Sequence, residues 1–154
     1  MRQGLDSGQA KGTGPSHAYF LYLLAEAHLQ LGEVHPGRAR LTEALEEINR
    51  VGTRAFEPEM YRVQGELLRL LPNSNEAGAE ASFHKAIEMA QAQTARTLEL
   101  RAATSLAHLW QQQGKREAAY SLLAPVYGWF TEGFDTADLE EARVLLEQLC
   151  PANS

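Results

Sequence analysis

A small residue recurs at a nearly constant distance along this chain of 154 residues. Ala25, Gly65 and Ala107 are separated by 40 and then 42 positions, and each stands inside an apolar helical segment that is followed by a second one. A fixed period of about 20 to 50 residues is typical of helical solenoids. Small residues recur in them because two helices that cross closely leave no room beyond Cβ. The chain is therefore expected to be a helical-repeat protein.

Apolar spacing, caps and helix breakers together predict seven helices. The expected helices span residues 16–31, 36–50, 58–71, 76–93, 97–113, 116–127 and 136–149. Apolar residues three and four positions apart give each of them a buried face, and glycine or proline marks most of the ends. Pro125 is expected to kink the sixth helix or to end it early. No segment shows convincing strand signals, so the predicted fold class is all-α.

Three helix pairs and a final helix are expected to form one domain over residues 16–149. The pairs cover residues 16–52, 57–94 and 97–130, and residues 1–15 form a flexible segment or the end of a preceding repeat. Because the end of a solenoid must be covered to stay soluble, the helix at 136–149 is predicted to cap the array. Its apolar stripe, expected to lie on the sixth helix, is Leu139, Ala142, Leu145, Leu146 and Leu149. Its acidic side is expected to remain in water, with Asp138, Glu140, Glu141 and Glu147.

Charge and cysteine content narrow the classes of partner. The formal net charge of −6 argues against nucleic acid as the main partner, because phosphate binding needs clustered Lys and Arg. Cys150 is the only cysteine, so no intrachain disulfide can form and a cytoplasmic, reducing setting is expected. No apolar run approaches the roughly 18 residues that a membrane-spanning helix needs.

The chain lacks the common catalytic and nucleotide-binding motifs. It contains no GxxxxGK[ST], GxSxG, HExxH or CxxC sequence, so we expect neither an enzyme nor a bound cofactor. Glu80, His84 and Glu88 follow one another at helical spacing and could hold a divalent metal. A solvated helix face with one histidine is the favoured interpretation, and no metal site is predicted.

The recurring residues resemble the tetratricopeptide pattern over residues 19–130. The first helices carry Leu24-Ala25-(x2)-His28, then Tyr61, Gly65 and Leu68, then Leu106-Ala107-(x2)-Trp110. The second helices carry Leu41 and Ala44, then Ala79, Phe83 and Ala86, then Ala119 and Leu123. This resemblance implies a right-handed superhelix of antiparallel helix pairs, with repeats longer than the usual tetratricopeptide length.

A narrower resemblance concerns the stretches at 61–68, 98–107, 113–116 and 122–136. They are similar to the C-terminal end of large bacterial signalling proteins that join a class III adenylate/guanylate cyclase domain, or another effector, to an AAA-type ATPase and a long tetratricopeptide array. The chain resembles the last three repeats of such an array. The resemblance implies that any catalytic activity of such proteins sits outside this chain.

The inner face of the first helix of each pair is the expected binding surface, because solenoids usually bind partners on a concave face. On the tetratricopeptide register, its residues are Tyr22, Glu26, Leu29, Arg62, Glu66, Arg69, Arg101, Thr104, His108 and Gln111. The three arginines could form a basic stripe that binds carboxylates or phosphates in bidentate fashion. The alternative is that Arg62, Glu66 and Arg69 pair along one helix.

Four aromatic residues form a second candidate surface near the end of the third pair. They are Tyr127, Trp129, Phe130 and Phe134. The favoured interpretation is that they seal the last repeat against the final helix. The alternative is that they dock another domain or subunit.

These observations favour a non-catalytic interaction or regulatory module of a cytoplasmic bacterial signalling protein. The expected partner is a protein or peptide, or another domain of the same polypeptide, and the chain is expected to be a monomer or a weak homodimer. The alternative is a small-molecule sensor domain, as in the helical-repeat effector domain of the bacterial maltose-regulon activator. A deep, aromatic-lined pocket favours the sensor, and a shallow, polar groove favours the interaction module.

Overall fold

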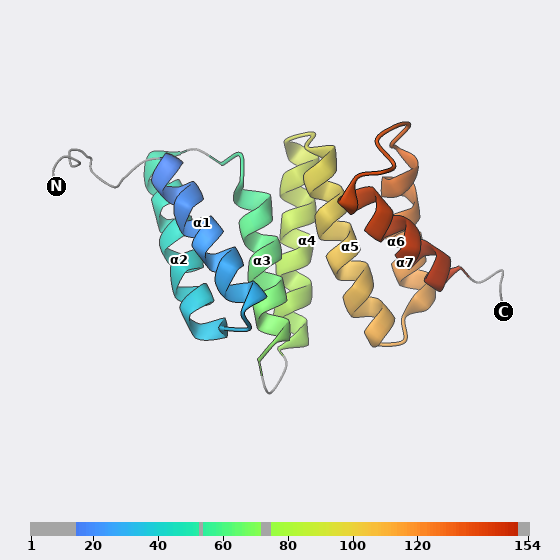
Figure 1. Ribbon diagram of the computed structural model, residues 1–154, viewed down its shortest axis with the longest axis horizontal. Helices are drawn as coiled ribbons and strands as arrows, with labels where there is room; N and C mark the ends of the chain where they lie inside the picture. Colours follow the sequence, from blue (N-terminus) through green and yellow to red (C-terminus); the bar gives the residue numbers. More distant parts are fainter. Residues whose placement is uncertain (1–14, 53, 72–74, 151–154) are drawn as a thin grey trace, which may run out of the picture.

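Seven helices make up the described part of the chain. The computed structural model describes residues 15–52, 54–71 and 75–150. The helices are α1 (Pro15–Gln30), α2 (Val34–Val51), α3 (Glu57–Arg69), α4 (Glu76–Ala92), α5 (Arg96–Gln112), α6 (Arg116–Gly128) and α7 (Ala137–Leu149). They follow one another in a row, with α1 and α7 toward opposite ends of the long axis (Figure 1). These ranges contain no strand, so the all-α prediction is confirmed.

Local sequence signals account for most helix boundaries. The Asn75 side chain accepts a hydrogen bond from the Gly78 amide at 3.0 Å, and this cap starts α4 where the sequence predicts a start. Thr136 caps α7 in the same way through the Leu139 amide. Gly52 ends α2 in the left-handed conformation, with φ of +80°, which glycine adopts without a Cβ clash.

Of the two alternatives predicted for Pro125, early termination of the helix is excluded, and another boundary prediction lies outside the described residues. Pro125 does not end α6 early, because the helix continues to Gly128. Pro125 stands in the last turn, so its missing amide removes only one backbone hydrogen bond close to the helix end. The prediction of a flexible segment or repeat end at residues 1–15 falls almost entirely on residues that the structure does not describe.

The odd-numbered helices line one side of the row. Each helix packs against the next one along the chain, and α1 also contacts α3, α3 contacts α5, and α5 contacts α7. Figure 1 shows α1 in front of α2 and α7 in front of α6. The last helix was expected to lie on α6, but it packs on both α5 and α6. This position brings Asp138 and Glu141 of α7 into contact with Arg101 and His108 of α5.

Two apolar clusters form the core and meet at α3. One joins α1, α2 and α3 through Leu21, Ala25, Leu41, Ile48 and Val63, among others. The other joins α3 to α7 through residues that include Phe83, Leu106, Leu123, Leu145 and Leu149. The α3 side chains divide between them, with Leu67 in the first cluster and Leu68 in the second. Consecutive residues of α3 therefore tie the two halves of the row together.

The recurring small residues lie at close helix contacts. Ala25 and Ala107 are completely buried. A Cβ placed on Gly65 of α3 would lie 2.5 Å from the Phe83 ring of α4. That distance is far shorter than a normal carbon–carbon contact. The small residue at this position therefore allows α3 and α4 to approach each other as closely as they do.

Gly65→Ala should consequently lower the free energy of unfolding by about 1–3 kcal/mol. Alanine has the higher helix propensity by about 1 kcal/mol, so a loss of stability would identify the contact with Phe83 as its cause. Gly128→Ala is the matched control, because no atom lies within 4 Å of a Cβ built there. Urea unfolding followed by circular dichroism measures both variants. Equal stability of the two variants would contradict close packing at Gly65.

Candidate functional site

A cavity of about 410 Å³ opens on the side of the row where the odd-numbered helices meet. Its walls come from four helices that are far apart in the sequence. They are Tyr19, Tyr22, Leu23 and Glu26 of α1, Arg62 and Glu66 of α3, Arg101, Thr104 and Ser105 of α5, and Asp138 and Glu141 of α7. Charged side chains make up more than half of this lining. We call this the inner cavity.

Helical spacing explains why each helix contributes a pair of polar residues. Tyr22 and Glu26, like Arg62 and Glu66, are four residues apart, and Asp138 and Glu141 are three apart. Residues at these intervals lie on the same face of a helix. The opposite faces carry the apolar residues of the two core clusters, so packing of the core turns the polar pairs toward one another.

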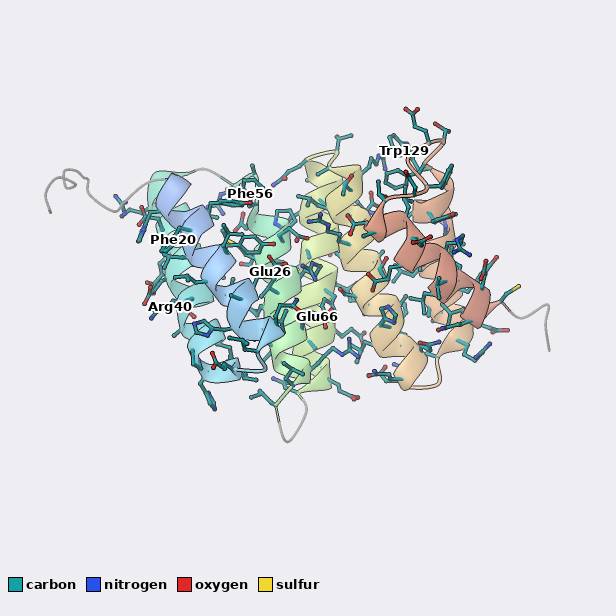
Figure 2. The ribbon with its side chains drawn as sticks, viewed as in Figure 1. Phe20, Glu26, Arg40, Phe56, Glu66 and Trp129 are labelled. Atoms are coloured by element: carbon teal, nitrogen blue, oxygen red, sulfur yellow. The ribbon has the colours of Figure 1, made fainter. Side chains whose placement is uncertain are left out.

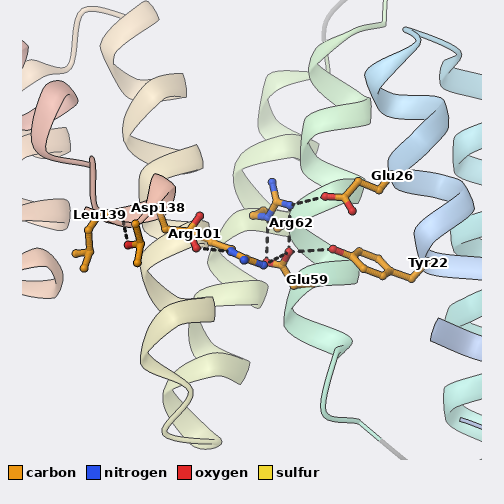
Figure 3. Close-up of polar contacts among 8 residues, drawn as sticks. Tyr22, Glu26, Glu59, Arg62, Arg101, Asp138 and Leu139 are labelled. Carbon is orange, nitrogen blue, oxygen red and sulfur yellow. Dashed lines mark hydrogen bonds and ion pairs between the residues drawn. The ribbon is translucent and has the colours of Figure 1, made fainter. Parts of the chain in front are cut away.

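The Glu59 carboxylate joins three of the four walls. Only 2% of this residue is exposed. Glu59 Oε2 accepts a hydrogen bond from Arg62 Nε at 3.0 Å, and Oε1 accepts from Arg62 Nη2 at 3.1 Å. Oε1 also accepts from Arg101 Nη1 at 3.1 Å and from the Tyr22 hydroxyl at 3.0 Å. Arg101 Nε donates in turn to Asp138 Oδ2 at 2.9 Å. Figure 3 shows this chain of contacts from α1 through α3 and α5 to α7.

These contacts shift the protonation equilibria of the network. Burial alone would raise the pKa of Glu59, but the hydrogen bond and charge of Arg62, the charge of Arg101 and the Tyr22 hydroxyl outweigh it and lower that pKa. Burial also works to lower the pKa of Arg62, and its pairing with Glu59 reverses the effect and raises it. Burial, followed by the negative charges of Glu59 and Glu26, raises the pKa of the Tyr22 hydroxyl. Glu59 is therefore ionised at neutral pH, and Tyr22 is a hydrogen-bond donor.

Each of the three arginines expected to form a basic stripe is paired with carboxylates. Arg62 contacts Glu59 and lies 3.7 Å from Glu26, and Arg101 contacts Glu59 and Asp138. Arg69 pairs with Glu66 at 3.2 Å. The pairing of Arg69 with Glu66 is the one that the sequence alternative describes, whereas Arg62 turns toward the preceding helical turn. The cavity thus holds no stripe of uncompensated positive charge.

The expected groove residues divide among three places. Six of them lie in the inner cavity, namely Tyr22, Glu26, Arg62, Glu66, Arg101 and Thr104. Leu29 and Arg69 line a neighbouring cavity of about 530 Å³, where Arg69 Nη2 donates to Gln112 Oε1 at 2.7 Å. His108 and Gln111 contact α7 instead, through Glu141 at 3.1 Å and Gln148 at 3.1 Å respectively.

Six residues of the site are absent from the set predicted from the sequence. They are Asp138 and Glu141 of α7, and Tyr19, Leu23, Glu59 and Ser105 of α1, α3 and α5. The acidic residues of α7 were expected to remain in water, and Glu140, Glu141 and Glu147 are exposed, whereas Asp138 is partly covered. Asp138 and Glu141 also line the inner cavity. His108 lowers the pKa of Glu141 through their hydrogen bond. Asp138 and Glu141 are about one helical turn apart and so share a face of α7, yet nothing in the sequence indicates that this face meets α5. Tyr19, Leu23, Glu59 and Ser105 lie next to, or one helical turn before, an expected groove residue, at positions that the expected register did not assign to the groove.

The four aromatic residues at the end of α6 and just after it differ in their exposure to solvent. Tyr127 and Phe130 pack against the core cluster that joins α3 to α7. The Tyr127 and Phe134 rings lie 5.8 Å apart, and the Trp129 and Phe130 rings meet edge to face at 5.3 Å. Trp129 stays 54% exposed, with the Arg96 guanidinium 4.9 Å from its ring centre. Tyr127 and Phe130 therefore seal the core, and Trp129 stands at the surface (Figure 2).

The described residues form neither a metal-binding cluster nor a membrane-spanning helix. Within residues 15–52, 54–71 and 75–150, no group of three or more His, Cys, Asp or Glu side chains is placed to hold a metal ion. His84 does lie 3.8 Å from Glu80 on α4, as helical spacing predicts. Among the helices of the same ranges, none combines the length and apolar character needed to cross a membrane.

Comparisons with known proteins assign this chain to no family. No protein-family model matches the chain, and neither the curated proteins nor the solved structures gave a match.

Proposed function

We propose that the protein is a non-catalytic interaction module with tetratricopeptide-like helix pairs, and that its inner cavity binds a segment of a partner protein. The observation that carries this proposal is the convergence of polar side chains from α1, α3, α5 and α7 on one cavity, held in place by the buried Glu59 network. Side chains fixed before binding lose little conformational freedom when a ligand arrives, which favours recognition.

The chemistry of the lining supports a peptide more than an apolar small molecule. The inner cavity is lined largely by charged side chains, with the aromatic rings confined to Tyr19 and Tyr22 on one wall. Sites for small organic ligands are usually lined by apolar and aromatic groups with few polar ones. A row of carboxylates, guanidinium groups and hydroxyls suits the polar backbone and side chains of an extended segment. The small-molecule sensor remains the second candidate, because the cavity volume lies in the range of such sites.

The resemblance of the stretches 61–68, 98–107, 113–116 and 122–136 to the end of a repeat array supports a regulatory role in a cytoplasmic bacterial signalling protein. In that setting, the bound segment belongs to a partner or to another domain of the same polypeptide. Binding that favours one arrangement of the effector would shift its activity by the difference in affinity for the two states.

Selection from a random peptide display library tests the proposal. The purified chain should enrich a family of peptides, and Leu23→Trp should abolish their binding because Leu23 lies exposed on the wall of the inner cavity. Leu31→Trp is the matched control, since Leu31 is exposed after α1 and does not line the cavity. Enriched peptides that bind both variants equally would place the interaction elsewhere, and failure to enrich any peptide would overturn the proposed function.

A further inference from the structure

The inner cavity carries an excess of negative charge. Four carboxylates line it, from Glu26, Glu66, Asp138 and Glu141, against two guanidinium groups. Both guanidinium groups are held by the buried Glu59 carboxylate. The Glu59 and Asp138 carboxylates together match these two positive charges, so the cavity has little positive charge left to attract an anion.

Two of these carboxylates are only weakly compensated. Glu26 lies 3.7 Å from Arg62, which itself makes closer contacts to Glu59. Glu141 pairs with a histidine, His108, and not with a lysine or arginine. Glu26 projects from α1 toward Arg62 on α3 (Figure 3), while Glu141 belongs to α7, so they approach the cavity from opposite walls. A cation between these walls would face negative charge on two sides.

The wall formed by α1 adds aromatic faces. The Tyr19 and Tyr22 rings lie 5.9 Å apart at the cavity lining, and Tyr19 packs against Phe56 at 4.7 Å. The electron-rich face of an aromatic ring attracts ammonium and guanidinium groups. Rings next to carboxylates are thus a common setting for a cationic side chain with an aliphatic stem.

An unpartnered buried hydroxyl provides an independent sign of a ligand. Thr104 of α5 lines the inner cavity and is only 5% exposed, yet its Oγ1 has no hydrogen-bond partner. Buried hydroxyls without a partner are rare because desolvation is costly. The feature is distinct from the carboxylates, since a hydroxyl is neutral and can both donate and accept a hydrogen bond. A donor from a bound group would satisfy it.

We propose that the inner cavity recognises a lysine or arginine side chain of a basic peptide segment. Carboxylates of Glu26 and Glu141 face the cation, the tyrosine rings contact its aliphatic stem, and the Thr104 hydroxyl accepts a hydrogen bond from the segment. This inference rests on the proposed function and specifies its ligand.

Nuclear magnetic resonance titration of the ¹⁵N-labelled full chain tests the charge. The probes are three capped Gly/Ser peptides of equal length that carry two lysines, two Nε-acetyl-lysines or two glutamates. The lysine peptide should shift amide signals around Glu26, Thr104 and Glu141, and its affinity should fall as salt rises. Acetyl-lysine keeps the stem without the charge, so it should bind at least about tenfold more weakly.

Two substitutions, at Glu26 and Thr104, test whether the lysine peptide binds in the inner cavity. Glu26→Gln should weaken binding of the lysine peptide about tenfold, whereas Glu46→Gln on the exposed side of α2 should not change it. Thr104→Val should leave the melting temperature unchanged or raise it, because the hydroxyl has no partner in the free protein. The same variant should bind the peptide several-fold more weakly, an effect that a purely structural role of Thr104 would not produce.

The contrary outcomes separate this inference from the proposed function. If display-selected peptides bind the inner cavity but are acidic or uncharged, the cation inference is wrong and the interaction module stands. If spermidine shifts the same amides with higher affinity than the lysine peptide, the occupant is a free amine and the peptide assignment is overturned. If no peptide of any charge binds there, both proposals fail.

Discussion

Truncation after Gly133, which removes α7, should lower the melting temperature by about 10 °C or more and cause self-association. The helix buries Leu139, Leu145 and Leu149 almost completely against α5 and α6. Burial of a leucine stabilises a protein by about 1.5–3 kcal/mol, so the loss is a large part of the roughly 5–15 kcal/mol of a typical domain. The surface uncovered includes Leu123 and Ala119, both fully buried in the complete chain. Apolar patches of this kind promote association.

Calorimetry and sedimentation velocity measure the two effects, and neighbouring positions on α7 supply a control in the full-length chain. Leu145→Glu places a charge in the core and should reproduce the loss of stability. Val144→Glu alters the adjacent, exposed residue and should have little effect. A truncated chain that remains monomeric and melts like the complete one would show that α7 is a detachable arm and not a cap.

The elements that sequence predicts well are those set by local interactions. Helix boundaries agree with the observed ones to within two residues, because caps such as Asn75 and Thr136 act through neighbouring amides. The burial of Ala25, Gly65 and Ala107 likewise follows from their recurrence. Of the two outcomes predicted for Pro125, early termination does not occur, because a proline in the last turn costs a helix little.

The candidate site was harder to predict because it depends on where helices lie relative to one another. The odd-numbered helices expected to share a face do contribute Tyr22, Arg62 and Arg101 to one cavity. Their charges could not be assigned from spacing, since Arg62 has glutamates both before and after it in α3. In the structure Arg62 pairs with Glu59, and Tyr22 and Arg101 contact the same carboxylate from other helices. Such a three-helix contact leaves no periodic signal in the sequence.

Glu59→Gln should be the most destabilising conservative substitution in the inner cavity, lowering the free energy of unfolding by about 3–5 kcal/mol at neutral pH. The amide retains the size of the carboxylate and still accepts a hydrogen bond from Tyr22. It leaves Arg62 with only the more distant Glu26 carboxylate at 3.7 Å, and Arg101 with only Asp138. Loss of one member of a buried charge network costs more than the pair contributes, because the remaining charge stays desolvated.

A second buried glutamate on the same helix provides the control. Glu57 is also almost completely buried, but its carboxylate pairs with Arg54, whose side chain is 48% exposed. Because water can solvate Arg54 once its partner is neutral, Glu57→Gln should cost about 1 kcal/mol or less. Chemical denaturation of the two variants at pH 7 compares them directly. Equal losses would mean that the Glu59 contacts between helices add nothing to those within a helix.

The pH dependence of the Glu59→Gln effect carries a definite sign. The pKa of Glu59 in the folded protein lies below its ordinary value of 4.5, so its carboxylate binds protons more readily in the unfolded chain. Its contribution to stability is therefore complete above that ordinary value and is lost as pH falls through the lower, folded pKa.

The difference in unfolding free energy between wild type and Glu59→Gln should be constant from pH 7 to about 5 and shrink steadily below about 4.5. Urea midpoints measured at intervals between pH 7 and 3 provide this difference, in which the titration of other carboxylates cancels. A gap that stays constant throughout would mean that Glu59 is not held ionised by Arg62 and Arg101, and that the network joining the walls of the inner cavity is wrongly assigned.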